Sequence, residues 1–425
     1  MLTRWRLALG KLSKRMWFRS TLYGALGVIT ALAGAFLKFL IPHTLATRIG
    51  ADSVGNILAI LAASMLTVTT FSLSTMVSAY ASASNSATPR AARLLIEDTR
   101  AQGALATFIG AFLFSIVGLI ALSTGLYGEG GRLVLFGATI AVIVLITVTL
   151  LRSIEQFSRF GRLGETIDLV ELATRDAMRR RAQDPLLGAA PGAHPLPDEA
   201  QRLYSEQVGY VEHLDVARLD AIAAEHALTI YVLCQPGTFA TPQRPILAVA
   251  GRTDAALLGR LRAAVSVSEA RSVEHDPRYG LVILAEIAQR SMSAAINDPG
   301  TCIDVIGTCV RLLCGWAHKR ARTPAPEIRY PHVRVAPLSE RDMVEDAFAP
   351  IARDAAGALE VNIQLQKAFA AVARADSPEM REAALMLAQQ SLQRGLQTLR
   401  FGPDQEALRA AALSENGIAS ASTPA

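Results

Sequence analysis

The 425-residue sequence has few of the residues that mark disulfide scaffolds, metal sites or nucleic-acid-binding surfaces. Its four cysteines form no CxxC pair, and its seven histidines are scattered without i, i+4 spacing, which argues against a disulfide framework and a metal site. Aromatic residues make up 6% of the chain and interleave with no basic tract. Nucleic acid is therefore not an expected partner.

Sequence motifs of common catalytic sites are also missing. The chain has no P-loop, no dinucleotide-binding glycine pattern, no GxSxG and no HExxH, and no nucleophile–base set replaces them. His275-Asp276 beside Glu274 is a candidate acid–base cluster, but a helix that is capped by Asp276 and begins at Pro277 explains these residues more simply. We therefore expect neither an enzyme nor a bound cofactor.

Long apolar runs are what the first third does contain. Four of them, at residues 22–41, 54–80, 104–126 and 133–151, are long enough as helices to cross a bilayer core of about 30 Å. Residues 1–152 are therefore predicted to form an α-helical membrane bundle with four transmembrane helices. The lipid bilayer is its first expected partner.

The basic residues around these runs predict the orientation. They concentrate before the first run, between the second and third, and after the fourth, whereas the two opposite loops hold only Arg48 and Arg132. Because cytoplasmic loops are enriched in Lys and Arg, both termini are expected in the cytoplasm.

The second apolar run is rich in hydroxyl groups. Thr67, Thr70, Ser74 and Ser78 follow the spacing of one helix face. Such a face suits helix–helix packing in lipid, or it lines a hydrated pore; both interpretations stay open. Beyond this run, Pro89, Arg90 and Arg93 lie where the chain leaves the membrane, and they are a candidate hinge.

The remainder of the chain predicts a cytoplasmic α+β domain. Residues 153–197 read as an amphipathic helix and a Pro-rich linker, and residues 198–251 as a small β unit. Residues 252–414 form a mostly helical part, with one long helix expected at 341–372. The Ser/Ala-rich tail at 415–425 is expected to be disordered.

Two segments carry a family resemblance. Residues 71–112, with Pro89-Arg90, and residues 271–306, with Asn297-Asp298-Pro299, resemble the bacterial predicted membrane proteins grouped as domain of unknown function 2254 (DUF2254). The resemblance implies a membrane bundle followed by a cytoplasmic domain in the bacterial inner membrane, but no established activity. Ala294 stands where the resemblance leads us to expect proline.

The Asn-Asp-Pro segment has two interpretations. Asp298 can cap a helix that begins at Pro299. Alternatively, Asp276, Arg290, Asn297 and Asp298 form a polar cluster where two helix ends meet, and they bind a ligand or partner, since helix N-termini favour anions.

Two functions follow from these features. The first is a homo-oligomeric channel or transport-like protein of the inner membrane, controlled by its cytoplasmic domain. The alternative is a membrane-anchored sensor or scaffold that binds an unidentified ligand or partner through that domain. The hydroxyl-rich run favours the first function, and the Asn-Asp-Pro segment favours the second.

Overall fold

A computed structural model of the protein describes residues 16–36, 51–96, 99–127, 129–159, 161–192 and 196–415. The chain divides into two compact units, Met1–Thr166 and Ile167–Ala425. Residues 37–41 of the first predicted span, most of the basic N-terminal flank and residues 416–425 of the predicted tail lie outside the described residues.

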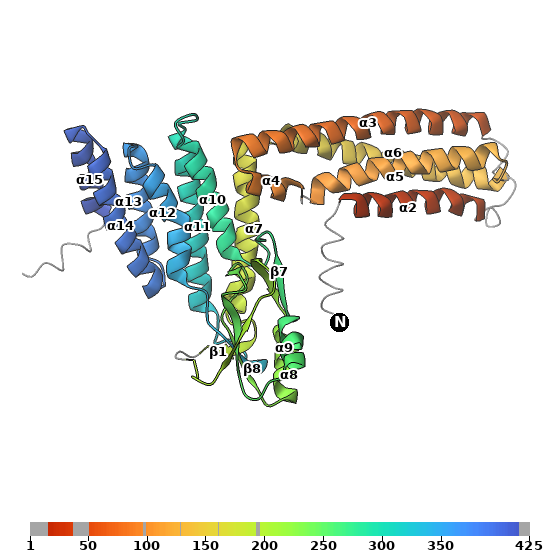
Figure 1. The fold of residues 1–425 in the computed structure, drawn as a ribbon. Helices are drawn as coiled ribbons and strands as arrows, with labels where there is room; N and C mark the ends of the chain where they lie inside the picture. Colours follow the sequence, from red (N-terminus) through yellow and green to blue (C-terminus); the bar gives the residue numbers. More distant parts are fainter. Residues whose placement is uncertain are drawn as a thin grey trace, which may run out of the picture. The chain divides into compact units, whose positions relative to one another are not determined.

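The first unit is a bundle of long apolar helices (Figure 1). Its described helices are α2 (Met16–Phe36), α3 (Ala51–Ser86), α4 (Pro89–Ile96), α5 (Thr99–Ser123) and α6 (Glu129–Arg159). Helix α5 packs against α2, α3 and α6. A Cβ atom at Gly27 would lie 2.4 Å from the carbonyl oxygen of Gly110, so these glycines let the backbones of α2 and α5 touch.

Four helices among the described residues are long and apolar enough to cross a membrane: Ser53–Ser86, Gln102–Ser123, Gly131–Ile154 and Pro299–Arg322. The first three coincide with the predicted spans at 54–80, 104–126 and 133–151. The predicted span at 22–41 is represented by a shorter apolar stretch, Phe18–Ala33. The fourth helix, Pro299–Arg322, belongs to the second unit, where the sequence predicts a helix of the cytoplasmic domain.

The structure divides the helix predicted to follow the fourth span. Helix α6 continues to Arg159, and α7 (Leu163–Gln183) begins after a turn at Gly161, whose φ is +79°. Only glycine adopts this left-handed conformation easily. A Cβ atom there would also lie 3.0 Å from the Cα atom of Ala79, so the turn packs directly on α3.

Two sheets form the β part of the second unit. The strands are β1 (Ala189–Pro191), β2 (Gln201–Tyr204), β3 (Gly209–Leu214), β4 (Thr229–Val232), β5 (Phe239–Ala240), β6 (Pro245–Ala250), β7 (Val265–Ser268) and β8 (Tyr330–Val335). One sheet has the order β1-β8-β4-β6-β2 and the other β5-β3-β7. Strands β1, β7 and β8 lie outside the predicted β unit at 198–251. Strand β8 joins by parallel pairing with β4, which no local pattern indicates.

Burial explains why β4 and β6 lie inside the larger sheet. Strand β6 buries four successive residues, Ile246 to Val249, and β4 buries Ile230 and Val232. Helix α8 (Val216–Glu225) packs against β8 and β4. Its Leu219 and the strand residues Leu247 and Val333 are fully buried in one apolar cluster. Helix α9 (Ala255–Arg262) covers β2.

The rest of the second unit is helical. Its helices are α10 (Pro277–Ser291), α11 (Pro299–Arg322), α12 (Glu340–Asp354), α13 (Leu359–Ala373), α14 (Pro378–Thr398) and α15 (Gly402–Glu415). The single helix predicted at 341–372 is two helices, because the chain turns at residues 355–358 around Gly357. Helices α10, α11 and α14 each begin with proline after a capping Asp276, Asp298 or Ser377, as predicted for the first two.

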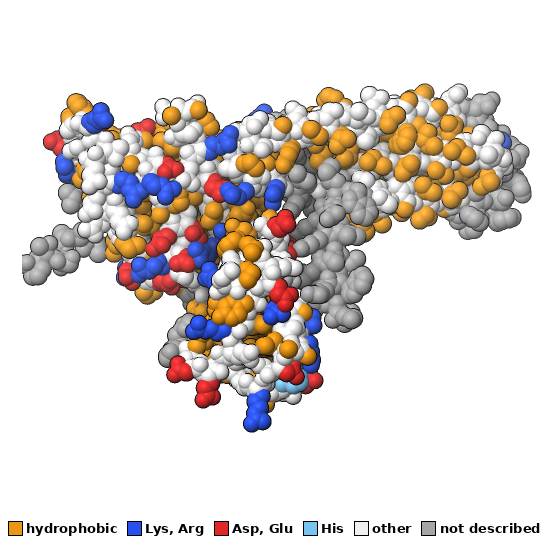
Figure 2. Space-filling model, in the orientation of Figure 1, with side chains coloured by type: hydrophobic (Ala, Val, Ile, Leu, Met, Phe, Trp, Pro, Cys, Tyr) orange, Lys and Arg blue, Asp and Glu red, His pale blue; other side chains and the backbone are white. Residues whose placement is uncertain are grey.

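The surfaces of the two units differ in character. In Figure 2, hydrophobic side chains cover the visible face of the first unit, whereas acidic and basic side chains gather over the second. Helix α11 is apolar because it is enclosed by its own unit: it packs against α10, α12 and α13. Its Cys302, Val305 and Leu313 are fully buried there.

Candidate functional sites

The four hydroxyl residues predicted to share one face of α3 are exposed, not packed inside the first unit. Thr67, Thr70, Ser74 and Ser78 all lie on the exposed side of the helix. The opposite side buries Leu58, Met65 and Met76, among others, against the neighbouring helices. Packing among the described residues therefore does not explain the hydroxyl face.

The hydrogen bonds of this face fall into two kinds. The hydroxyls of Thr67 and Thr70 donate to the carbonyl oxygens of Ala63 and Leu66, at 3.0 and 2.8 Å. This back-bonding satisfies a hydroxyl within its own helix. The hydroxyls of Ser74 and Ser78 have no hydrogen-bond partner among the described residues. They keep an unmet hydrogen-bonding capacity in the middle of an apolar helix.

The exposed face of helix α6 provides a comparison for the hydroxyl face of α3. Its exposed large hydrophobic residues include Ile140, Val144, Leu145, Val148, Leu151 and Ile154. The exposed Thr147 donates its hydroxyl to the carbonyl oxygen of Ile143 at 2.9 Å. Helix α3 also exposes Leu66, Leu73 and Val77, and their spacing places them beside the hydroxyl stripe. Phe71 is exposed too and lies within the stripe. The hydroxyl groups of α3 therefore surround one exposed aromatic ring.

The predicted hinge residues lie at a break in the helix. Helix α3 ends at Ser86 and α4 begins at Pro89. Proline disfavours helical conformation at the residue before it, and the hydroxyl of that residue, Thr88, accepts a hydrogen bond from the backbone N–H of Ala91 at 3.1 Å. Pro89, Arg90 and Arg93 are exposed, whereas Ala91 and Ala92 are buried. The break is observed; motion at it stays a prediction.

The structure does not bring Asp276, Arg290, Asn297 and Asp298 into one cluster. Asp276 caps the start of α10, whereas Arg290 lies in its last turn. A 15-residue helix is about 22 Å long, so Asp276 is separated from the other three by the length of α10. Asn297 has a left-handed backbone with φ +50°, and Asp298 caps α11.

Asp298 behaves as a helix cap in this geometry. Its carboxylate accepts hydrogen bonds from the backbone N–H of Thr301 at 3.1 Å and from the Thr301 hydroxyl at 2.6 Å. These hydrogen bonds lower the pKa of the Asp298 carboxyl. The contacts satisfy the capping interpretation of the Asn-Asp-Pro segment and leave its ligand-binding interpretation as a prediction.

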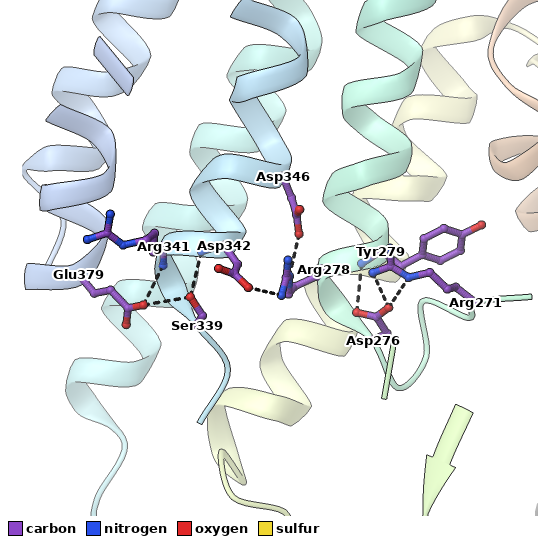
Figure 3. A network of polar contacts seen from close by, with 9 residues as sticks. All are labelled: Arg271, Asp276, Arg278, Tyr279, Ser339, Arg341, Asp342, Asp346 and Glu379. Carbon is purple, nitrogen blue, oxygen red and sulfur yellow. Dashed lines mark hydrogen bonds and ion pairs between the residues drawn. The ribbon is translucent and has the colours of Figure 1, made fainter. Parts of the chain in front are cut away.

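Asp276 lies in a tighter environment at the other end of α10 (Figure 3). Its carboxylate accepts a hydrogen bond from Arg271 Nε at 2.8 Å, and the guanidinium carbon of Arg271 lies 4.8 Å from the centre of the Tyr279 ring. Burial raises the pKa of the Asp276 carboxyl, against the opposing effect of Arg271. A Cβ atom at Gly237, whose φ is +91°, would lie 2.1 Å from Asp276 Oδ2. Only glycine fits beside this carboxylate.

Further ion pairs join the N-terminal ends of α10, α12 and α14 (Figure 3). Arg278 of α10 contacts Asp342 and Asp346 of α12 at 2.5 and 2.7 Å. Glu379 of α14 accepts hydrogen bonds from the Ser339 hydroxyl and the Arg341 backbone N–H, both at 3.1 Å. The sequence analysis missed this polar layer. The only local sequence signal for it is a capping serine followed within two residues by a glutamate, as in Ser339-Glu340 and Ser377-Pro378-Glu379.

Among the described residues, no group of three or more His, Cys, Asp or Glu side chains is placed to hold a metal ion. His213 and His275 have ring centres 5.3 Å apart. Burial lowers the pKa of His213, which favours a neutral ring.

These features describe a membrane protein with a bundle of apolar helices and a second, mixed α/β unit. The chain belongs to the family described as predicted membrane protein (DUF2254), whose family model matches residues 13–371. The match covers the first unit from residue 13 onward and the second unit as far as residue 371, within α13. No curated protein and no solved structure matches the chain.

Proposed function

We propose that the protein is a homo-oligomeric channel or transport-like protein of the bacterial inner membrane, in which α3 faces α3 of other copies. Residues 22–41, 54–80, 104–126 and 133–151 are its four spans. The second unit lies in the cytoplasm and controls the assembly. The observation that carries the proposal is the exposed hydroxyl face of α3.

The physical reason is the cost of unsatisfied polar groups in lipid. A polar group without a hydrogen-bond partner costs several kcal/mol in the hydrocarbon core, and Ser74 and Ser78 have none within the described chain. A second protein surface or water supplies the partner. Small and hydroxyl residues also allow helices to approach closely, so several copies of α3 can surround a common axis.

The composition of α3 fits a hydrated path without a charge filter. From Ser53 to Ser86 the helix carries no Asp, Glu, Lys or Arg. Hydroxyl groups line such a path as hydrogen-bond donors and acceptors, whereas rings of charged side chains select ions by sign. Small polar or hydrated solutes are the class that this lining suits.

The orientation rests on the basic residues. Arg90 and Arg93 of α4 and Arg152 of α6 lie on the side that the positive-inside rule assigns to the cytoplasm, and Arg132 lies at the opposite end. Cysteines introduced in the loops at 44–53 and 123–132 should react with an impermeant reagent from the periplasmic side. Protection of both loops from that side would overturn this topology.

Cysteine substitution tests both assembly and hydration of α3. The chain is prepared with Cys314→Ala, because the other three native cysteines are buried. Ser74→Cys and Ser78→Cys should form disulfide-linked dimers under mild oxidation. Leu145→Cys and Val148→Cys, on the exposed apolar face of α6, are the matched controls and should not.

A second readout separates a channel from a simple interface. A charged, membrane-impermeant thiosulfonate should modify Ser74→Cys in membranes at least about ten times faster than Leu145→Cys, because a thiol reacts as a thiolate in contact with water. Cross-linking without this reaction would show a dry interface and contradict conduction. Absence of both results would contradict the whole proposal.

The alternative is a membrane-anchored sensor or scaffold whose second unit binds a ligand or partner. A cavity in the second unit, away from α3 in the sequence, favours it. Ligand binding by a protein whose α3 forms no cross-link would favour the sensor over the channel.

A further inference from the structure

The second unit contains a cavity of about 360 Å³. It lies where the end of α7, the last turns of α11 and the starts of α12 and α14 meet. Its polar lining residues are Arg181, Arg320, Trp316, Glu340, Ser377 and Glu379, and the remaining ones are three prolines and a leucine. The volume is at the lower end of the range of small-molecule sites, about 300–1,000 Å³.

Arg181 is the unusual member of this lining. Its relative exposure is 6%, and burial lowers the pKa of its guanidinium to about 10, so it stays charged at neutral pH. One nitrogen donates to the side-chain oxygen of Gln235, but Nε has no hydrogen-bond partner. No carboxylate of the described residues forms an ion pair with it.

The nearest acidic groups have other partners. Asp184 and Asp276 act on Arg181 at longer range, but Asp184 pairs with Arg329 and Asp276 pairs with Arg271. A buried charge without a counter-ion is strongly unfavourable unless something neutralises it. Arg181 is therefore placed for an anion that the chain itself does not supply.

Arg320 adds a second cationic group to the same wall. It lies one turn after Trp316 on α11, and its Nη1 donates to the carbonyl oxygen of Ala182 at 3.3 Å. It too forms no ion pair among the described residues. Two guanidinium groups beside an indole ring suit a carboxylate or phosphate group, since arginine matches both geometries with paired hydrogen bonds.

The two glutamates of the cavity do not neutralise these arginines. Glu340 accepts hydrogen bonds from Trp316 Nε1, at 2.7 Å, and from the Ser377 hydroxyl. Glu379 accepts from Ser339 and Arg341 at the start of α12 (Figure 3). Both carboxylates thus interact with the N-terminal ends of α12 and α14, which favour negative charge, and neither forms an ion pair with Arg181 or Arg320 among the described residues.

We propose that this cavity binds a small organic anion. Its carboxylate or phosphate group contacts Arg181 and Arg320, and its apolar part lies against Trp316 and the prolines. The site is separate from the α3 face and does not depend on conduction.

Fluorescence of Trp316 tests the proposal on the full chain in detergent. The sequence has three tryptophans, so Trp5→Phe with Trp17→Phe leaves Trp316 as the reporter inside the cavity. The probes are benzoate, phenyl phosphate and inorganic phosphate. Saturable quenching by benzoate identifies a carboxylate ligand, and quenching by phenyl phosphate identifies a phosphate ester. Each result supports the site, whereas no saturable change with either organic probe overturns it.

Two arginine variants and one control locate the binding. Arg320→Gln and Arg181→Gln should each weaken binding of the organic probe about tenfold or more, because hydrogen bonds to charged groups are the strong ones. If Arg181→Gln does not fold, Arg320→Gln alone decides, since its side chain is only partly buried. Arg353→Gln, an exposed residue of α12 outside the cavity, should bind like the parent protein.

Two outcomes would contradict the assignment. Unchanged affinity in Arg320→Gln would show that the probe binds elsewhere. Inorganic phosphate binding as tightly as phenyl phosphate would show that the apolar lining contributes nothing, and would refute an organic ligand.

Discussion

Gly280 of α10 gives the sharpest test of the packing in the second unit. A Cβ atom at this position would lie 1.9 Å from Oγ1 of Thr174 in α7 and 2.7 Å from both its Cβ and its Cγ2. Thr174 is fully buried, and its hydroxyl donates to the carbonyl oxygen of Val170 at 2.6 Å. Rotating the threonine does not remove the overlap, because its Cβ is itself too close. Helices α7 and α10 have to separate.

The magnitude follows from two opposing effects. Alanine in place of glycine in a helix normally stabilises by about 0.5–1 kcal/mol. Overpacking of a closed core costs typically about 1–3 kcal/mol. Because an approach of 1.9 Å calls for the upper end of the overpacking cost, Gly280→Ala should lower the free energy of unfolding by about 2 kcal/mol, and lower Tm by roughly 4–8 °C for a unit of this size.

Gly315 of α11 is the matched control. It is an exposed glycine inside a helix, and a Cβ atom there would meet nothing within 4 Å. Gly315→Ala should raise Tm by roughly 2–4 °C. Thermal unfolding of both variants, followed by circular dichroism in the same detergent, shows whether Tm falls in Gly280→Ala and rises in Gly315→Ala. A Gly280→Ala protein as stable as Gly315→Ala would refute the close contact between α7 and α10.

Two further predictions concern Asp298 and Glu171. Asp298→Ala should lower the free energy of unfolding by about 0.5–2 kcal/mol, because the cap of α11 is lost, whereas Asp298→Asn, which still caps, should change it by a few tenths; a folded but inactive Asp298→Asn protein would instead favour a ligand role. Glu171 of α7 is buried, which raises its pKa, but hydrogen bonds from Arg311, at 2.6 Å, and Arg175 outweigh burial and lower the pKa below its ordinary 4.5. The carboxylate therefore stabilises the fold at neutral pH, and this contribution disappears as the pH falls through the lowered pKa. Glu171→Gln should cost about 2 kcal/mol in denaturant unfolding at pH 7 and progressively less in acid; a difference independent of pH would contradict the ion pairs.

The features that the sequence predicted are those with a local cause. Three of the predicted spans follow from continuous apolar runs, and the starts of α10 and α11 follow from Asp276-Pro277 and Asp298-Pro299. A 15-residue helix such as α10 is about 22 Å long, so Asp276 and Asp298 lie near its opposite ends. The four residues of the predicted polar cluster therefore do not meet.

The features that the sequence missed depend on residues far apart in the chain. Strand β8 pairs with β4, although about a hundred residues separate the two strands in the sequence. The short alternating pattern of β8 predicts a strand but does not indicate which strand it pairs with. Arg181 is the last of three successive arginines near the end of α7, a pattern typical of a solvated helix end. Its burial arises only from the packing of distant segments, including Gln235, Trp316 and Glu340, around it.

Two reciprocal hydrogen bonds join the starts of α12 and α14: Ser377 donates to Glu340, and Ser339 donates to Glu379. Each helix thus supplies the acceptor for the other's capping hydroxyl, although the two starts are nearly forty residues apart. The family match ends at residue 371, so an expression fragment cut at that boundary would lose Ser377 and Glu379 together. Such a fragment would keep every matched residue and the Ser339 cap of α12, but it would lose the packing of α14 against α12 and α13. A fragment meant to fold like the whole second unit should therefore include α14.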